Sequence, residues 1–353
     1  MKTTGMDRRG FVAGASLAGF GCFAPIARGA APEARRRVRL LLNTSWSGPQ
    51  AWFLLAQDLG YFRREGLEVE MTQGAGAYTA APRVAAGSFD FGYGDINALI
   101  EVSARMPDRA PVAVFVAFNR SPSTIAVDSD GPIRSPKDLE GRTVVGHDTD
   151  VALKTFGAFC KANGIDQSKV KIGIGDSMAG MVKRMLGSSD VCGVFGYVST
   201  LQAAIAETNP ALARRVRYIR YADSVPDLYG SALFASRAML KREPETVRGM
   251  VKAFNAGLVA LMNDQARGLD SVLKRSGTER HVETLRLATT LDLEMGHPDG
   301  RRLGIGDVDD ARFARSIALL AETNKLPRTP APSEVFIRDF LPPLSERVTS
   351  LGK

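Results

Sequence analysis

Small polar and aromatic side chains stand in loops directly after apolar, strand-like runs of this sequence, where they could hold a small molecule. In open parallel sheets, ligands lie beyond the carboxyl ends of the strands, where loops meet the N-termini of helices. These loops therefore define a candidate ligand-binding set. Its members are Ser45, Trp46, Gly76, Tyr78, Asp95, Asn97, Asn119, Ser121, His147, Thr149, Tyr197 and Tyr229.

The polar members of this set leave two kinds of ligand open. Unpaired backbone N–H groups at the helix starts near Ser45, Gly76 and Thr149 would suit an oxyanion such as a sulfonate or a carboxylate. A carboxylate at Asp95 would instead repel an anion and favour an amine or a pyrimidine N–H. Asp95 is also an ordinary candidate for a helix N-cap, a role that needs no ligand.

The aromatic members are Trp46, Tyr78, Tyr197 and Tyr229. Packing in the core is an alternative role for each of them. Together they provide more aromatic surface than a small inorganic anion such as nitrate needs. As a group they favour an organic ligand with a flat or apolar body.

Metal binding and catalysis have little support in the sequence. His147 has no second histidine or cysteine near it, so it is a poor metal ligand and either bonds the ligand or belongs to a surface loop. Cys160 and Cys192 are expected to be buried free thiols. No Ser-His-Asp spacing, nucleophile elbow or phosphate-binding loop is present. We therefore expect no enzyme, no catalytic residues, no metal and no cofactor.

The elements that must position these loops alternate between strands and amphipathic helices, which predicts βαβ units and mainly parallel sheets. Strands are predicted at 38–42, 67–71, 89–93, 112–118, 124–127, 143–145, 170–174, 191–195 and 232–235. Helices are predicted at 49–59, 79–86, 96–105, 151–162 and 179–186, and the chain beyond Pro244 is predominantly helical.

The length of 353 residues exceeds what one hydrophobic core usually supports, so two domains are expected. Residues 119–123 form a short linker that Pro122 stiffens, and the chain is expected to return near Gly230. The predicted fold is a two-lobed α/β protein with a ligand cleft between the lobes. Its predicted parts are an export signal at 1–30, the first part of lobe 1 at 31–123, lobe 2 at 124–231, and at 232–353 the return to lobe 1 with the C-terminal helices.

The first thirty residues have the features of an export signal. Arg8 and Arg9 precede a weakly apolar run, rich in glycine and alanine, that ends near Ala27. The paired arginines resemble a twin-arginine signal, with the general secretory route as the alternative. Retention as an uncleaved anchor and lipidation at Cys22 are weaker alternatives. The mature chain is therefore expected in the periplasm, beginning near residue 30.

The formal net charge of +8 does not by itself indicate nucleic-acid binding. Part of it lies in the export signal and part in the basic cluster at 35–39, whereas later charges mix both signs. That distribution is typical of a solvated surface, so we expect no nucleic-acid partner.

Several segments, taken in order, resemble one family. They are residues 56–70, 84–95, 133–144, and 229–235 followed by 244–248. The sequence resembles the type II periplasmic binding proteins of the nitrate, sulfonate and taurine group, the NMT1/THI5-like or SsuA family, over about residues 38–273.

This resemblance implies the solute-binding component of an ABC importer. Such a protein would act as a monomer, bind a small organic ligand (sulfonate, carboxylate or pyrimidine-like), and pass it to permease and ATPase subunits. A sensor that presents its ligand to a signalling partner is an alternative. A pyrimidine-synthase-like enzyme on the same fold is another, but the sequence lacks the cysteine-rich cluster of the eukaryotic synthases.

Overall fold

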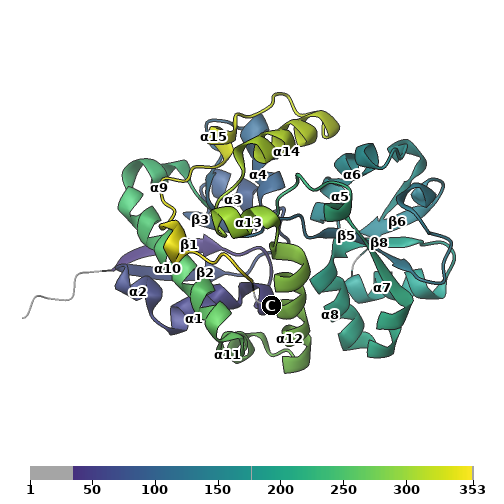
Figure 1. Ribbon diagram of the computed structural model, residues 1–353, viewed down its shortest axis with the longest axis horizontal. Coiled ribbons are helices and arrows are strands. Elements are labelled where there is room, and N and C mark those ends of the chain that lie inside the picture. The colour runs from purple at the N-terminus through teal and green to yellow at the C-terminus, as the bar shows by residue number, and fades with distance from the viewer. Residues whose placement is uncertain (1–34, 176, 352–353) are drawn as a thin grey trace, which may run out of the picture. The chain divides into compact units, whose positions relative to one another are not determined.

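The computed structural model describes residues 35–175 and 177–351, which form two five-stranded sheets flanked by helices (Figure 1). The first sheet has the order β2-β1-β3-β10-β4. Only β10 runs antiparallel to its neighbours β3 and β4. The strands of this sheet are β1 (Arg36–Leu41), β2 (Leu67–Thr72), β3 (Phe91–Asp95), β4 (Val112–Val116) and β10 (Ser231–Ala235).

The second sheet has the order β7-β6-β8-β5-β9, and here β5 is the antiparallel strand. Its strands are β5 (Ser123–Asp128), β6 (Thr143–Gly146), β7 (Lys171–Ile174), β8 (Gly193–Tyr197) and β9 (Val216–Arg220). The two sheets therefore share one order, in which an antiparallel strand lies fourth. The chain passes from the first sheet to the second after β4, and back again before β10. We refer to the elements around each sheet as the first and the second lobe.

The helices follow the strands in the alternation that the sequence predicts. In the first lobe they are α1 (Ala51–Asp58), α2 (Tyr61–Arg64), α3 (Ala80–Ala85) and α4 (Ile96–Arg105). In the second lobe they are α5 (Val151–Lys154), α6 (Phe156–Ala162), α7 (Met178–Gly187) and α8 (Val198–Thr208). Gly60 adopts a φ of 73° directly after the end of α1, a conformation that glycine reaches without strain.

The chain after β10 is a run of helices that we call the C-terminal segment. It contains α9 (Arg237–Arg242), α10 (Pro244–Asn263), α11 (Gln265–Ser276), α12 (Arg280–Thr289), the π-helix η6 (Thr290–Met295), α13 (Pro298–Leu303), α14 (Asp310–Thr323) and α15 (Pro332–Val335). Short 3₁₀ helices are η1 (Gly48–Gln50), η2 (Pro136–Leu139), η3 (Gln167–Lys169), η4 (Pro210–Arg215), η5 (Tyr221–Asp223) and η7 (Leu344–Glu346). No helix in the described residues is long and apolar enough to cross a bilayer.

The first sheet packs through an aromatic cluster against α1 and α10. The ring centroid of Phe53 lies 4.7 Å from that of Phe254 and 5.0 Å from that of Tyr93. A Cβ at Gly257 of α10 would lie 2.3 Å from the carbonyl oxygen of Trp52, so glycine is needed for the two helices to approach this closely. The start of α1 is thereby held firmly against the first sheet.

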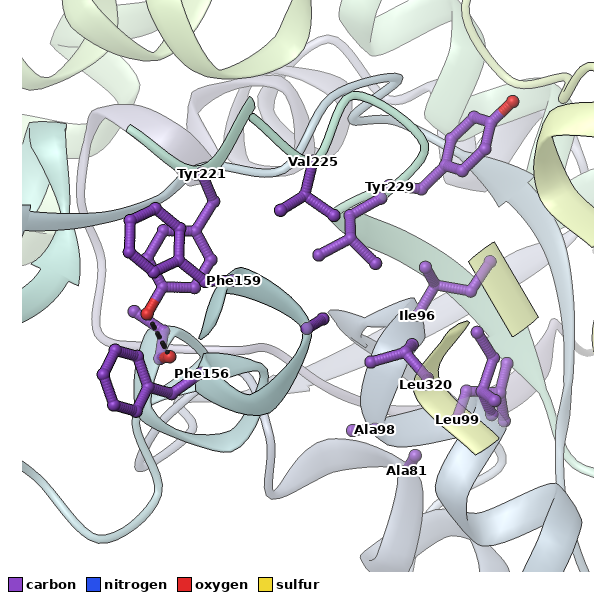
Figure 2. Packing of buried hydrophobic residues seen from close by; sticks show 14 of the residues in the cluster. Ala81, Ile96, Ala98, Leu99, Phe156, Phe159, Tyr221, Val225, Tyr229 and Leu320 are labelled. Atoms are coloured by element: carbon purple, nitrogen blue, oxygen red, sulfur yellow. Dashed lines mark hydrogen bonds between the residues drawn. The ribbon is translucent and has the colours of Figure 1, made fainter. Parts of the chain in front are cut away.

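A second apolar cluster contains residues of both lobes (Figure 2). Ile96 and Leu99 of α4 belong to it, together with Phe159 and Tyr221 of the second lobe. Phe159 and Tyr221 stack with ring centroids 4.4 Å apart, and the Tyr221 hydroxyl donates to the carbonyl oxygen of Ala152 over 2.8 Å. Continuous apolar packing thus joins the lobes beside the segments through which the chain crosses.

Candidate functional site between the two sheets

The two lobes meet where β3 and β8 end. β3 leads into α4 at Asp95, and β8 leads into α8 at Tyr197, with no intervening loop in either case. The Tyr197 hydroxyl donates to Oδ2 of Asp95 over 3.2 Å. Two helix N-termini that follow strands of different sheets are therefore brought to one place.

Asp95 is the centre of this place. It is 0% exposed, and its Oδ1 accepts from the backbone N–H of Asn97 at 2.9 Å and from Nδ2 of Asn97 at 2.7 Å. Asp95 is therefore the N-cap of α4, as the sequence predicted. Burial raises the pKa of Asp95 to about 7, and the hydrogen bonds from Asn97 and Tyr197 oppose this rise. Asn97 also donates to the carbonyl oxygen of Tyr229.

Several buried hydroxyl groups around Asp95 lack a hydrogen bond of normal geometry within the described residues. Ser231 on β10 stands directly opposite Asp95, and Ser123 on β5 stands directly opposite Tyr197. Tyr93, two residues before Asp95 on β3, has no hydrogen-bond partner within the described residues apart from the Ser231 hydroxyl. Burial raises the pKa of Tyr93 well above its usual value; the Ser231 hydroxyl opposes the rise, and the charges of Asp95 and Glu294 add to it. Buried polar groups without partners are rare, so this region is suited to receive a polar ligand.

A carboxylate from the C-terminal segment lies at the start of α8. Glu294 of η6 is 1% exposed, and its Oε1 accepts from the backbone N–H of Ser199 at 2.8 Å. Its Oε2 accepts from the hydroxyls of Ser199 at 2.9 Å and Thr290 at 3.0 Å. Burial raises the pKa of Glu294 to about 7, although the bonds from Ser199 and Thr290 and the charge of Arg286 oppose this.

Other helix starts also hold carboxylates of this chain. Oε2 of Glu283, a fully buried residue of α12, accepts from the backbone N–H of Gly48 at 2.6 Å, at the start of η1. Oδ1 of Asp150 accepts from the backbone N–H of Ala152 at 2.8 Å in α5, and burial raises the pKa of Asp150 to about 6. Gly76 donates its N–H to the carbonyl oxygen of Asn43.

The expectation of unpaired N–H groups at these helix starts is therefore wrong for the amides named here. The physical reason is that glutamates remote in sequence, together with local aspartates and carbonyl groups, already accept their hydrogen bonds. An oxyanion would have to displace these acceptors.

The four predicted aromatic residues have different surroundings. Tyr197 reaches Asp95, whereas the Tyr78 hydroxyl donates to Glu101 of α4. Trp46 is half-buried and packs against the apolar cluster that contains Phe53 and Phe254. Tyr229 is buried against the C-terminal segment: its hydroxyl accepts from the backbone N–H of Asp309, and the Arg312 guanidinium lies 4.0 Å from its ring centroid. In Figure 2 the Tyr229 hydroxyl points away from the other labelled residues.

The remaining candidates lie on the loops and on the crossing segment. Gly76 and the half-buried Thr149 come from different lobes, yet a Cβ at Gly76 would lie 2.9 Å from the Thr149 hydroxyl. His147 is half-buried and Ser45 is exposed.

Asn119 and Ser121 belong to the crossing segment and are both buried. Asn119 donates to the carbonyl oxygen of Asp307, and Ser121 accepts from the backbone N–H of Ser123. Their bonds in the structure therefore stabilise the crossing.

The surface also has open grooves away from this region. One, of about 780 Å³, lies along α1, α2 and α10 and is lined by residues that include Tyr61, Glu65 and Lys252. The Glu65 and Lys252 side chains form an ion pair there, so their charges are already neutralised. Within the described residues, no three His, Cys, Asp or Glu side chains are grouped to hold a metal ion.

A model of the NMT1/THI5-like family matches residues 50–267. The chain belongs to the NMT1/THI5-like family. This confirms the resemblance in the sequence and places Asp95, Tyr197 and Ser199 inside the matched region. Glu283 and Glu294 of this NMT1/THI5-like protein lie beyond it.

Solved structures share the fold of this NMT1/THI5-like protein. The alkanesulfonate-binding protein SsuA from Xanthomonas axonopodis pv. citri, bound to MOPS, is 16% identical with a TM-score of 0.66, over 88% of this chain and 100% of that one. The periplasmic aliphatic sulphonate binding protein SsuA from Escherichia coli is 15% identical with a TM-score of 0.64, over 87% and 93%. A mutant of DSZB in complex with biphenyl-2-sulfinic acid is 14% identical with a TM-score of 0.57, over 86% and 97%. No curated protein matches the chain in sequence.

The sequence analysis missed the two glutamates of the C-terminal segment and their partner Ser199. One signal was available. Glu283, Leu287 and Glu294 follow helical spacing on one face, where an acidic residue among apolar ones is unusual. Such a pattern indicates a buried carboxylate, but not which helix start it contacts.

Proposed function

We propose that this protein is the periplasmic solute-binding component of an ABC importer, and that it binds a small organic molecule between the ends of β3 and β8. The observation that carries the proposal is the buried polar region around Asp95 and Tyr197, which includes hydroxyls without partners. Membership of the NMT1/THI5-like family supports it. So do the SsuA proteins that share the fold, since they are described as sulfonate-binding proteins.

Catalysis by a cysteine nucleophile is disfavoured by the state of the thiols. DSZB is a desulfurization enzyme on this fold, so the fold alone does not decide. In the described residues, Cys160 and Cys192 are both buried and free, as the sequence predicted. Burial, with a contribution from Asp166, raises the pKa of Cys160 to about 12, so its thiol stays protonated and is a poor nucleophile.

The binding proposal is tested by thermal unfolding in the presence of a metabolite library that includes nitrate. A ligand at a hundred times its dissociation constant adds about 2.7 kcal/mol of stability. For a protein of this size we expect Tm to rise by at least roughly 2 to 4 °C with an organic compound and to stay unchanged with nitrate. A library in which no organic compound raises Tm would contradict the proposal.

Ligand binding is proposed to close the two lobes about the two segments that join them, residues 119–123 and 221–230. A hinge at residues 231–235, which the sequence favoured, is not retained, because these residues form β10 within the first sheet. Two crossings permit rotation and resist sliding. Solution scattering should give a smaller radius of gyration at saturating ligand, and an identical profile would contradict closure.

Export is proposed to depend on the first thirty residues, which lie outside the described residues. If the twin-arginine route is used, changing Arg8 and Arg9 to Lys should leave the protein in the cytoplasm. Unaltered export of that double variant would indicate the general secretory route instead.

A further inference from the structure

We propose that the ligand is an organic cation, with an ammonium or amidinium group held between the carboxylates of Asp95 and Glu294. This inference rests on the proposed solute-binding function and narrows the class of solute. It argues against the sulfonate or carboxylate that the family resemblance suggests.

Three carboxylates from three parts of the chain act on Tyr197. Asp95 comes from the first lobe and accepts a hydrogen bond from the Tyr197 hydroxyl. Asp150 comes from the second lobe, where it caps α5, and Glu294 from the C-terminal segment accepts from the N–H of Ser199, two residues after Tyr197. Burial raises the pKa of Tyr197 well above its usual value, and the charges of Asp95, Asp150 and Glu294 add to that rise. The charges of three carboxylates, each from a different part of the chain, therefore act on the Tyr197 hydroxyl.

Two of these carboxylates have neutral hydrogen-bond partners. Asp95 accepts from Asn97 and Tyr197, and Glu294 accepts from Ser199 and Thr290. Neither carboxylate forms an ion pair within the described residues. Arg286 is the cation that acts on Glu294, but it forms its ion pair with Glu283, at 3.5 Å. Buried charge without a counter-charge is costly, and a bound cation would offset it.

Unpartnered hydroxyls supply the second, independent observation. Ser123 Oγ is buried and has no hydrogen-bond partner within the described residues, and Tyr93 Oη and Ser231 Oγ have none beyond the contact between their two hydroxyls. Ser231 stands opposite Asp95 in the strand register, and directly opposite residues of an antiparallel pair share a face of the sheet. A hydroxyl oxygen accepts an N–H as readily as a carboxylate does, so these groups complete a set of acceptors for a ligand that donates several hydrogen bonds.

Other ligand charges fit this region less well. An anion needs donors, but the backbone N–H groups of Asn97 and Ser199 at the starts of α4 and α8 already donate to Asp95 and Glu294. A metal ion needs converging ligands, and the described residues hold no group of three His, Cys, Asp or Glu with that arrangement. An organic cation with N–H donors satisfies both the charge and the hydroxyls.

The test is thermal unfolding at pH 8 with compounds matched in skeleton and differing in charge: benzamidine, benzamide, benzoate and benzenesulfonate, then alkylamines, carboxylates and sulfonates of equal chain length within a metabolite library. We expect the compounds that raise Tm to be cations. Isothermal titration of the strongest should show at least a tenfold loss of affinity in Asp95→Asn and in Glu294→Gln. The control Glu279→Gln changes an exposed residue at the start of α12 and should bind like the wild type.

The outcomes separate this inference from the proposed function. If the stabilising compounds are anions or neutral molecules, the proposed solute-binding function is supported and the proposal of a cationic ligand is wrong. If a cation binds but neither Asp95→Asn nor Glu294→Gln weakens it, the assigned site is wrong. If no compound raises Tm, both proposals fail.

Discussion

The junctions β3–α4 and β8–α8 occupy the same position in two sheets of the same strand order, but they satisfy their helix N-termini differently. Asp95 caps its own helix. Tyr197, at the corresponding place, has no carboxylate or amide oxygen to accept from α8, and Glu294 of the C-terminal segment supplies the acceptor instead. A junction with its own capping side chain needs no other part of the chain. The junction that has a tyrosine at this position depends instead on the C-terminal segment.

Both junctions use a carboxylate that is removed from water. Both carboxylates are buried, and burial raises the pKa of each to about 7. The first junction is self-contained, whereas the second couples the second lobe to the chain that follows β10. Variants that change one junction at a time distinguish these roles.

The largest expected effect is on the pH dependence of stability. The pKa of Asp95 is about 7 in the folded protein and about 3.9 in an unfolded chain. Asp95 therefore contributes stability that is fully present below about pH 4 and lost as the pH rises through 7. Relative to Asp95→Asn, the wild type should lose about 4 kcal/mol between pH 4 and 8.

The second junction should give the same sign and a similar size with Glu294→Gln, since the pKa of Glu294 is also about 7. Urea unfolding across this pH range measures both differences, with Glu279→Gln as a control. If the difference in unfolding free energy between the wild type and either variant does not change with pH, the carboxylate replaced in that variant has an ordinary pKa.

A smaller loss of stability is expected from Glu294→Ala. It removes the acceptor for two groups of Ser199 and for the Thr290 hydroxyl and leaves a cavity, which should cost about 3 kcal/mol at pH 6. Glu279→Ala, at an exposed site, should stay within about 0.5 kcal/mol of the wild type. Equal losses in the two variants would mean that α8 does not depend on the C-terminal segment.

The smallest effect is expected from Tyr197→Phe. It removes the hydroxyl that donates to Asp95 across the two lobes, for a loss of about 1 kcal/mol. Because that bond opposes the rise in the Asp95 pKa, the pKa should rise further in the variant. Tyr218→Phe, at a half-buried tyrosine of the same sheet, is the control for the loss of a tyrosine hydroxyl. A loss no greater than in this control would show that the hydrogen bond from Tyr197 to Asp95 does not stabilise the folded protein.

Much of the fold was predictable because strand and helix patterns are local. All nine predicted strands are present within two residues at either end, Gly60 follows the end of α1, and Asp95 caps α4. β9 was not predicted, since Arg217 and Arg220 make its short sequence look like surface. The sheets are mainly parallel, as expected, but each includes one antiparallel strand.

The site was less predictable because its acceptors come from long-range contacts. Loop position identified Asp95, Asn97 and Tyr197, which the structure does bring together. It also selected Tyr229, whose side chain packs against Arg312, and Ser45, which is exposed. Glu294 escaped notice because nothing local in its sequence indicates that the C-terminal segment reaches the start of α8.

A crystal structure with the compound that raises Tm most is the most direct test of the central claim that the solute binds between the two sheets. The account predicts ligand density between the ends of β3 and β8, within hydrogen-bond distance of Asp95. Density in the open groove along α1 and α10, with the region around Asp95 unchanged, would contradict it.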